Sequence, residues 1–220
     1  MQALALFDLD DTLVDRGKAF NAWAEEFVAA HGLDEKALTF LVVTDAGHSG
    51  PMNDYFATVR ETFDLAERPG QLWERYRGRM PELASCRSED LDALGRLRRA
   101  GWRIGIVTNG MTDNQLTKIR NTGLDALVDT WCISDEVGIR KPDPEIFRLA
   151  ARRCGASPEG GGWMVGDSLD LDIAGGRAAG LRTIWLPPKH RPEPSSRPAA
   201  APDFTVGSVA EAVGVILAAT

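Results

Sequence analysis

Short runs of apolar residues alternate with segments of helical periodicity over residues 1–14 and 86–220 of this 220-residue chain. The apolar runs have the length of strands, and they lie at residues 3–7, 102–107, 130–133, 163–165, 182–186 and 204–206. Continuous apolar runs of this length are typical of strands that are buried on both faces of a sheet. Because helical segments separate them, the pattern predicts an α/β fold with a doubly wound parallel sheet.

The segment between about residue 16 and residue 86 follows a different pattern, in which no strand is expected. The spacing of its apolar residues predicts helices over residues 20–31, 36–44, 53–63 and 71–80, with breaks that contain glycine and proline. We therefore expect two units. A core is formed by residues 1–15 and 86–220, and an all-helical domain is inserted into it over residues 16–85.

Capping signals place helix starts in the second half of the chain. Ser88 is expected to cap a helix that reaches residue 101, and Thr112 and Gln115 have the spacing of a capping box for a helix that closes at Gly123. Further helices are expected at residues 144–154, 172–179 and 209–218. Six of the 12 prolines lie in residues 187–202, which predicts a loop whose role the sequence leaves open.

The charge balance excludes some classes of protein. The chain has 25 Lys and Arg against 32 Asp and Glu, a formal net charge of −7, so general nucleic-acid binding is not expected. The N-terminus lacks a cationic start, and no apolar run approaches the roughly 20 residues of a membrane span. Three widely spaced cysteines favour reduced thiols over disulfides. We expect a cytoplasmic protein with no membrane partner, as a monomer or a homodimer.

Polar residues follow several of the expected strands at the point where each strand ends. Asp8 and Asp10 come after the first strand, residues 108–110 (Thr-Asn-Gly) after the second, and Asp167 after a later one. Lys141 lies in a loop between two expected elements. Since ligands of open parallel sheets bind beyond the carboxyl ends of the strands, we expect these residues to form one site.

The residue types at this site favour phosphoryl transfer. Several carboxylates at one edge repel one another unless a cation joins them, and ligand sets of oxygen atoms favour Mg²⁺. An aspartate beside the metal can attack phosphorus while a lysine offsets the developing charge, and a second aspartate is free for proton transfer. A threonine hydroxyl and backbone N–H groups can hold phosphoryl oxygens. The sequence therefore predicts a covalent aspartyl-phosphate.

Four motifs, taken in order, resemble those of the haloacid dehalogenase (HAD) superfamily of hydrolases. They are residues 7–13 (FDLDDTL), 108–110 (TNG), 141–147 (KPDPEIF) and 166–172 (GDSLDLD). The resemblance covers residues 1–14 and 86–220 and implies a Rossmannoid core. The helical insert at residues 16–85 is similar to the C1 cap of that superfamily, which lies between the first two motifs.

The resemblance implies a role for each matching catalytic residue. Asp8 is the nucleophile, and Asp10 is the general acid that protonates the leaving group and then the base that activates water. Thr108 and the N–H of Asn109 hold the phosphoryl group, and Lys141 neutralises the charge of Asp8 and of the phosphoryl oxygens. Thr12 orients the first loop.

The resemblance also implies a Mg²⁺ site. Its ligands are Asp8, the backbone carbonyl of Asp10, Asp167 and Asp172, the last as a direct ligand or as a partner of one. Asp170 fits the motif less well and is expected to start the following helix.

Substrate contacts are expected from both units. The substrate-binding residues that we expect are Thr108, Asn109 and Gly110 in the core, with Arg16 and His48 in the insert. Weaker candidates in the insert are Ser49, Asn53, Tyr55 and Arg60, and Trp23 and Trp73 are expected in its apolar core.

These features predict a Mg²⁺-dependent phosphatase that acts on the phosphoric monoester of a small metabolite. A phosphomutase remains open, because it would use the same aspartyl-phosphate. A dehalogenase is less favoured, because such enzymes need no acid at position 10 and lack an aspartate there. A phospho-acceptor module and a HAD scaffold that has become a binding protein are the non-enzyme alternatives. The sequence does not identify the substrate, because a fold does not determine a function.

Overall fold

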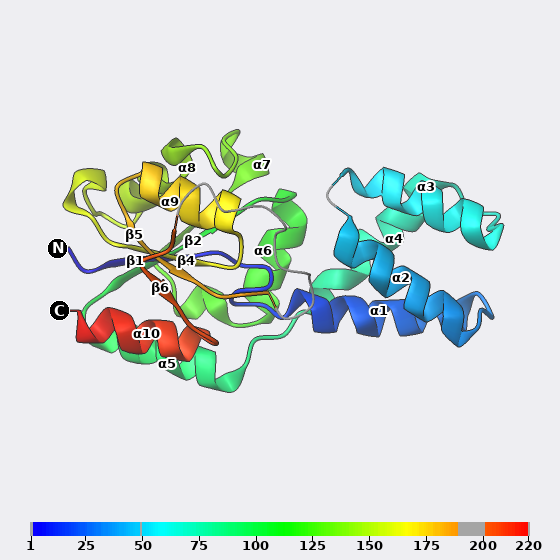
Figure 1. Ribbon diagram of the computed structural model, residues 1–220, viewed down its shortest axis with the longest axis horizontal. Coiled ribbons are helices and arrows are strands. Elements are labelled where there is room, and N and C mark those ends of the chain that lie inside the picture. Colours follow the sequence, from blue (N-terminus) through cyan, green and yellow to red (C-terminus); the bar gives the residue numbers. More distant parts are fainter. Residues whose placement is uncertain (1, 49, 189–200, 220) are drawn as a thin grey trace.

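The computed structural model describes residues 2–48, 50–188 and 201–219 (Figure 1). Its strands are β1 (Leu4–Phe7), β2 (Arg103–Thr108), β3 (Thr130–Ile133), β4 (Trp163–Gly166), β5 (Arg182–Trp185) and β6 (Phe204–Thr205). They form one parallel sheet in the order β3-β2-β1-β4-β5-β6. The predicted α/β fold with a parallel sheet is therefore confirmed. Ser49 and residues 189–200 of the proline-rich segment lie outside the described residues.

The first strand of the chain lies in the middle of the sheet. Leu4 pairs with Arg103 of β2, and Ala5 pairs with Trp163 of β4. All four residues of β1 are fully buried, as expected for a central strand that is covered on both faces. Because the strands are parallel, the carboxyl ends of β1, β2 and β4 meet at one edge of the sheet, and Asp8 follows β1 there.

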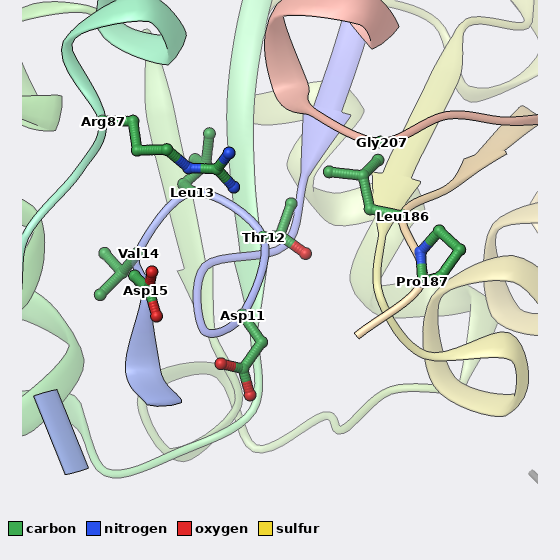
Figure 2. Close-up of a pocket in the computed structure, with 9 residues that line it drawn as sticks. All are labelled: Asp11, Thr12, Leu13, Val14, Asp15, Arg87, Leu186, Pro187 and Gly207. Atoms are coloured by element: carbon green, nitrogen blue, oxygen red, sulfur yellow. The ribbon is translucent and has the colours of Figure 1, made fainter. Parts of the chain in front are cut away.

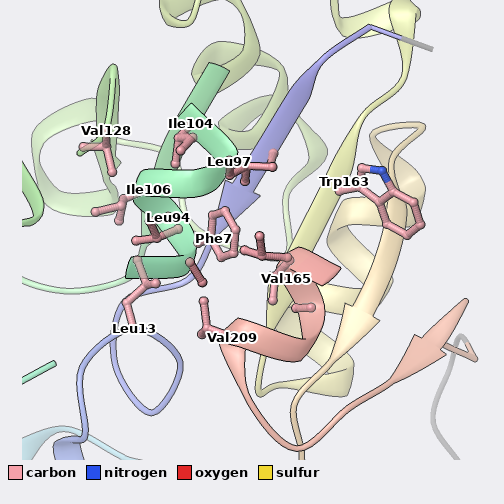
Figure 3. Close-up of a cluster of buried hydrophobic side chains, with 14 of the residues drawn as sticks. Phe7, Leu13, Leu94, Leu97, Ile104, Ile106, Val128, Trp163, Val165 and Val209 are labelled. Atoms are coloured by element: carbon pink, nitrogen blue, oxygen red, sulfur yellow. The ribbon is translucent and has the colours of Figure 1, made fainter. Parts of the chain in front are cut away.

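Helices cover both faces of the sheet (Figure 1). The helices of the core are α5 (Ser88–Arg99), α6 (Thr112–Asn121), α7 (Ser134–Val137), α8 (Pro144–Arg153), α9 (Ala174–Ala178) and α10 (Val209–Ala218). On one face, Phe7 packs in a cluster with Leu94 of α5 and Val209 of α10 (Figure 3). On the other face, Leu6 packs with Phe147 of α8. Alternate residues of β1 therefore supply two separate apolar layers.

Four helices lie between β1 and α5 in the chain, to one side of the sheet (Figure 1). They are α1 (Arg16–Ala30), α2 (Glu35–Gly47), α3 (Met52–Phe63) and α4 (Pro69–Leu83). An aromatic cluster joins them, in which the ring of Trp23 lies 4.9 Å from that of Tyr76 and 5.7 Å from that of Phe56. No residue of this cluster belongs to the two clusters of the core. We propose on this basis that residues 16–85 form a separate unit, the cap.

The cap is joined to the core at two places. The two connecting segments are bonded to each other, because the N–H of Asp15 donates to the carbonyl of Ser85 at 3.1 Å. Helix α4 also packs on α6, where the side-chain amides of Asn114 and Asn121 donate to the carbonyls of Arg77 and Pro81 at 2.9 and 3.1 Å. Helix α6 therefore lies between the cap and the sheet.

The predicted helix starts differ from the structure at three positions. Ser88 and Thr112 are the first residues of α5 and α6 and do not cap them. The hydroxyl and N–H of Thr112 instead donate to Asp135 at 2.7 and 3.0 Å, so the predicted capping box is wrong. The helix expected at residues 172–179 begins with a π-helical turn, η3 (Leu169–Ile173), and Asp170 lies within that turn.

Three short helices were not expected from the sequence, namely α7 and the 3₁₀ turns η1 (Leu124–Ala126) and η2 (Pro158–Gly160).

All three cysteines are unpaired, and Cys132 and Cys154 are buried. Within the described ranges, no helix is both long enough and apolar enough to cross a bilayer.

Candidate active site

The loop after β1 folds into a tight turn. The carbonyl of Leu9 accepts from the N–H groups of Leu13 and Val14 at 2.9 and 2.8 Å, and Asp11 has a positive φ of 58°. The N–H of Asp8 donates to the carbonyl of Val165 on β4, which continues the sheet beyond the end of β1. This turn directs Asp8 and Asp10 into the same cleft.

Lys141 is buried between two of the predicted acidic residues. Its Nζ lies 2.5 Å from Oδ1 of Asp8 and 2.7 Å from Oδ1 of Asp172. Burial by itself would lower the pKa of Lys141, but the two carboxylates outweigh it and raise that pKa. The side chain of Asn109 holds the backbone of Lys141, accepting from its N–H at 2.9 Å and donating to its carbonyl at 3.1 Å.

The carboxylates of Asp8, Asp167 and Asp172 form a cluster in which one oxygen atom of each lies within 4.8 Å of the others. Burial, with the charge of neighbouring aspartates, raises the pKa of Asp8 to about 7 and that of Asp167 to about 9. One lysine does not neutralise three ionised carboxylates, and the raised pKa values reflect the negative charge that would remain. A set of hard oxygen donors with this negative charge fits Mg²⁺.

Asp10 has a different environment from Asp8. Nζ of Lys118 lies 2.7 and 2.9 Å from its two carboxylate oxygens, and Nε2 of Gln115 donates to Oδ2 at 2.9 Å. Burial acts to raise the pKa of Asp10, but the charge and hydrogen bonds of Lys118 outweigh it, and the pKa falls below its usual range.

The second motif contributes unequally to the cleft. Thr108 lines the cleft, and its hydroxyl oxygen accepts from Gln115 at 2.7 Å. Asn109 also lines it. Gly110 does not, and its N–H donates to the hydroxyl of Ser134 at 3.0 Å. The prediction that Gly110 contacts the substrate therefore gains no support from its position.

The cleft has a volume of about 380 Å³ and lies between the core and the cap. Its described lining consists of Asp8, Asp10, Asp11, Arg16, Asp45, His48, Gly50, Met52, Thr108, Asn109, Arg140, Lys141, Asp167, Ser168, Leu171 and Asp172. On the cap side, two nitrogen atoms of Arg16 bond the two carboxylate oxygens of Asp45 at 2.7 and 2.6 Å. This bidentate pair faces the core carboxylates across the cleft.

The predicted cap residues divide into two groups. Arg16 and His48 line the cleft, as expected for substrate contacts. Tyr55 is buried in the cap and donates its hydroxyl to the carbonyl of Leu41 at 3.2 Å. Asn53 and Arg60 are exposed and do not line the cleft. Trp23 is buried in the aromatic cluster, and Trp73 packs against it, as predicted.

A second pocket lies beside the first loop, next to Arg87 and Leu186 (Figure 2). Thr12 lines this pocket, and its buried hydroxyl has no hydrogen-bond partner among the described residues. The pocket has a volume of only about 30 Å³, enough for a water molecule and too small for a metabolite. The larger cleft is therefore the candidate substrate site, and an orienting role for Thr12 stays a prediction.

The sequence reasoning missed several side chains of the site, among them the charged or amide side chains of Asp45, Gln115, Lys118 and Arg140. Gln115 and Lys118 are three residues apart on the buried side of α6, next to Ile119. Polar residues on the apolar face of an expected helix are the signal that could have found these two.

The family model described as a haloacid dehalogenase-like hydrolase matches residues 3–180. The pyrimidine 5′-nucleotidase YjjG of Escherichia coli is 37% identical over 147 residues, which are 67% of this chain and 64% of that protein. The phosphoserine phosphatase of Thermus thermophilus is 36% identical over 171 residues, which are 76% of this chain and 66% of that protein. The match to these two curated relatives thus spans slightly less than two thirds of their length.

A solved structure has the same fold. The HAD-hydrolase YfnB of Bacillus subtilis, determined bound to magnesium, superposes with a TM-score of 0.80 at 24% identity over 98% of both chains.

Proposed function

Because the chain belongs to the haloacid dehalogenase-like hydrolase family, we propose that it is a Mg²⁺-dependent phosphatase acting on the phosphoric monoester of a small metabolite. One observation carries this proposal. Asp8 and Asp10 enter the same cleft but have different partners, Lys141 for Asp8 and Lys118 with Gln115 for Asp10. One carboxylate is therefore suited to attack phosphorus, and the other is free to transfer protons.

In the first step, a carboxylate oxygen of Asp8 attacks phosphorus and the bond to the leaving oxygen breaks. Lys141 offsets the charge on the phosphoryl oxygens, and the hydroxyl of Thr108 donates a hydrogen bond to one of them. Asp10 is held as a carboxylate by Lys118 in the free enzyme, so it must take up a proton as the substrate binds. It then donates this proton to the leaving oxygen, so that an alcohol departs and Asp8 carries the phosphoryl group.

In the second step, the carboxylate of Asp10 accepts a proton from a water molecule as that water attacks the phosphorus of the aspartyl-phosphate. Inorganic phosphate leaves, and Asp8 is regenerated as a carboxylate. Asp10 thus regains the proton that it gave up in the first step, because it acts as an acid in that step and as a base in the second.

The acidic cluster supplies the cofactor site of this proposal. Asp8, Asp167 and Asp172 would hold the ion, with the backbone carbonyl of Asp10 as a further oxygen ligand. When bound there, Mg²⁺ would supply positive charge next to the phosphoryl group and to the three carboxylates.

The substrate is proposed to be small and polar. No Phe, Tyr or Trp side chain lines the described part of the cleft, whereas charged groups of the cap, such as Arg16 and Asp45, do. The imidazole ring of His48 is thus the stacking partner for a base that this lining offers. Curated relatives bear names for substrates as different as pyrimidine nucleotides and phosphoserine, so cap residues are the place to look for the choice.

The test is hydrolysis of p-nitrophenyl phosphate with Mg²⁺ by the wild type, Asp8→Asn and Asp10→Asn. The wild type is expected to release phosphate, and each variant is expected to lose at least about 100-fold in rate. Asp8→Asn lacks the nucleophile, and Asp10→Asn lacks the base of the second step. Asp125→Asn is the matched control, since Asp125 is exposed and lies outside the cleft. Unchanged rates in either active-site variant would contradict the proposal. Isomerisation of a sugar phosphate without release of phosphate would identify a mutase.

A further inference from the structure

Two polar side chains of α6 are almost completely buried beneath the cleft. Gln115 is 2% exposed and Lys118 is 5% exposed, and their spacing of three residues places them on the same face of the helix. A lysine is rarely buried to this extent unless its charge is paired. The group that pairs with Lys118 therefore indicates the role of Gln115 and Lys118.

Both side chains converge on the carboxylate of Asp10. Nζ of Lys118 lies 2.7 Å from Oδ1 and 2.9 Å from Oδ2, so a single ammonium group contacts both oxygens. Nε2 of Gln115 donates to Oδ2 at 2.9 Å. Three contacts from one rigid helix fix the carboxylate in one orientation, as charge-assisted hydrogen bonds do.

Gln115 extends this arrangement to the second motif. A carboxylate only accepts hydrogen bonds, so the nitrogen of the Gln115 amide must face Asp10. The same Nε2 lies 2.7 Å from Oγ1 of Thr108. Because Thr108 accepts this bond, its own O–H proton is free to be donated into the cleft. Gln115 thus ties the proposed proton donor to the proposed phosphoryl ligand.

Neither residue reaches the substrate directly. Gln115 and Lys118 are absent from the described lining of the cleft, whereas Asp10 and Thr108 are part of it. Next to this buried face, a stripe of α6 that includes Asn114 and Asn121 is bonded to the cap helix α4. The helix is therefore anchored on one side while its buried side holds the groups that face the substrate.

We propose that Gln115 and Lys118 are positioning residues, which hold the carboxyl group of Asp10 against the oxygen atom of the leaving alcohol. This inference rests on the proposed phosphatase function. It predicts that their loss harms proton transfer to the leaving group more than it harms binding of the phosphoryl group, which Lys141 and Thr108 contact.

The test compares two substrates with Lys118→Met and Gln115→Met. p-Nitrophenolate leaves as a stable anion, whereas the alkoxide of an alkyl phosphate needs a proton. kcat/KM reports the steps up to departure of the alcohol. We expect kcat/KM for the alkyl ester to fall at least about tenfold more than for the aryl ester in Lys118→Met. The inhibition constant of inorganic phosphate for that variant should stay within about twofold of the wild-type value, since Lys118 does not contact phosphate.

The controls separate this inference from the function on which it rests. Arg120→Met removes the same charge from an exposed position of α6 and should leave both values of kcat/KM unchanged. If Lys118→Met fails to fold, Gln115→Met gives the same comparison without a loss of charge. Equal losses on both esters, or none, would overturn the positioning role. A wild type that hydrolyses neither ester would instead overturn the phosphatase proposal.

Discussion

Asp8 and Asp10 are two residues apart in the chain, yet the pKa values of their carboxyl groups are shifted in opposite directions. Burial with nearby aspartates raises the pKa of Asp8 to about 7. Burial acts on Asp10 as well, but Lys118 brings its pKa below the usual range. The difference arises because burial and the charge of Asp172 outweigh Lys141 at Asp8, whereas Lys118 of α6 outweighs burial at Asp10. A short loop can therefore present two aspartates with different chemistry.

The raised pKa values of Asp8 and Asp167 predict how stability depends on pH without metal. Because both pKa values lie above 3.8 in the folded protein, the folded state binds more protons than the unfolded state between about pH 4 and 9. The free energy of unfolding should therefore fall as the pH rises through this window. The slope is at most about 1.4 kcal/mol per pH unit for each group.

Thermal unfolding in EDTA at pH 6 and pH 9 measures this effect, with a lower Tm expected at pH 9. Mg²⁺ should raise Tm more at pH 9 than at pH 6, because the ion binds deprotonated carboxylates. Asp167→Asn should flatten the pH dependence and weaken the effect of Mg²⁺. A Tm that rises from pH 6 to pH 9 in EDTA would be the opposite result.

A second prediction at this scale concerns the pair of Arg16 and Asp45, whose side chains are 16% and 8% exposed. Arg16→Met leaves Asp45 buried without its partner and should lower the free energy of unfolding by about 3 kcal/mol. Adding Asp45→Asn should recover most of that loss. Urea unfolding measures both, and Arg148→Met, which breaks an exposed pair with Glu145, should cost less than about 1 kcal/mol. Equal costs for the two pairs would contradict this account.

The sequence revealed those residues of the site that follow strands, because strand ends can be located from apolar runs. Asp8 and Asp167 are of this kind. Lys118 and Gln115 were not found, since their contacts with Asp10 join residues 108 and 105 positions apart in the chain. A polar residue on a helix is usually solvated, and only the packing of α6 against the first loop shows that these two are not.

Among the elements, strands and long helices were predicted closely, and helix starts were not. The runs at residues 130–133 and 209–218 coincide with β3 and α10. The start at Thr112 was interpreted as a capping box, yet Asp135 from another element took its hydrogen bonds. Apolar periodicity is set by one buried face, whereas a cap depends on which polar partners happen to be nearer in space.

Two helix glycines, one in α9 and one in α10, are predicted to respond oppositely to replacement by alanine. A Cβ atom on Gly175 would lie 2.7 Å from the ring of Phe147 and 2.9 Å from the carbonyl oxygen of Pro142. Gly175→Ala should therefore destabilise the protein by about 1–3 kcal/mol. A Cβ atom on Gly214 in α10 would meet no atom within 4 Å, so Gly214→Ala should stabilise by about 0.5–1 kcal/mol. Chemical denaturation measures the change in the free energy of unfolding of each variant. A loss of stability in both variants would contradict the prediction.

For the whole molecule, the separate aromatic cluster of the cap predicts separable unfolding. Phe56 is fully buried in that cluster and Phe147 in the core, so Phe56→Ala and Phe147→Ala each remove about 3–5 kcal/mol from their own unit. In Phe56→Ala, the cap should unfold at lower urea than the sheet. Far-ultraviolet circular dichroism, to which the helices of both units contribute, should then show two transitions with different midpoints in urea. Coincident midpoints in this variant would show one cooperative unit and contradict the proposed division.

The central position of β1 has a consequence for the newly made chain. Its four apolar residues are made well before their partners, since β2 and β4 begin about 100 and 160 residues later. The helices of residues 16–83 make mostly local contacts and can form in that interval. Closing the chain around them costs about 4 kcal/mol by the logarithmic dependence on loop length. During synthesis, the segment Leu4–Phe7 therefore lacks its partner on β4 until Trp163 has been made, and it is a stretch that a nascent-chain chaperone would have to protect.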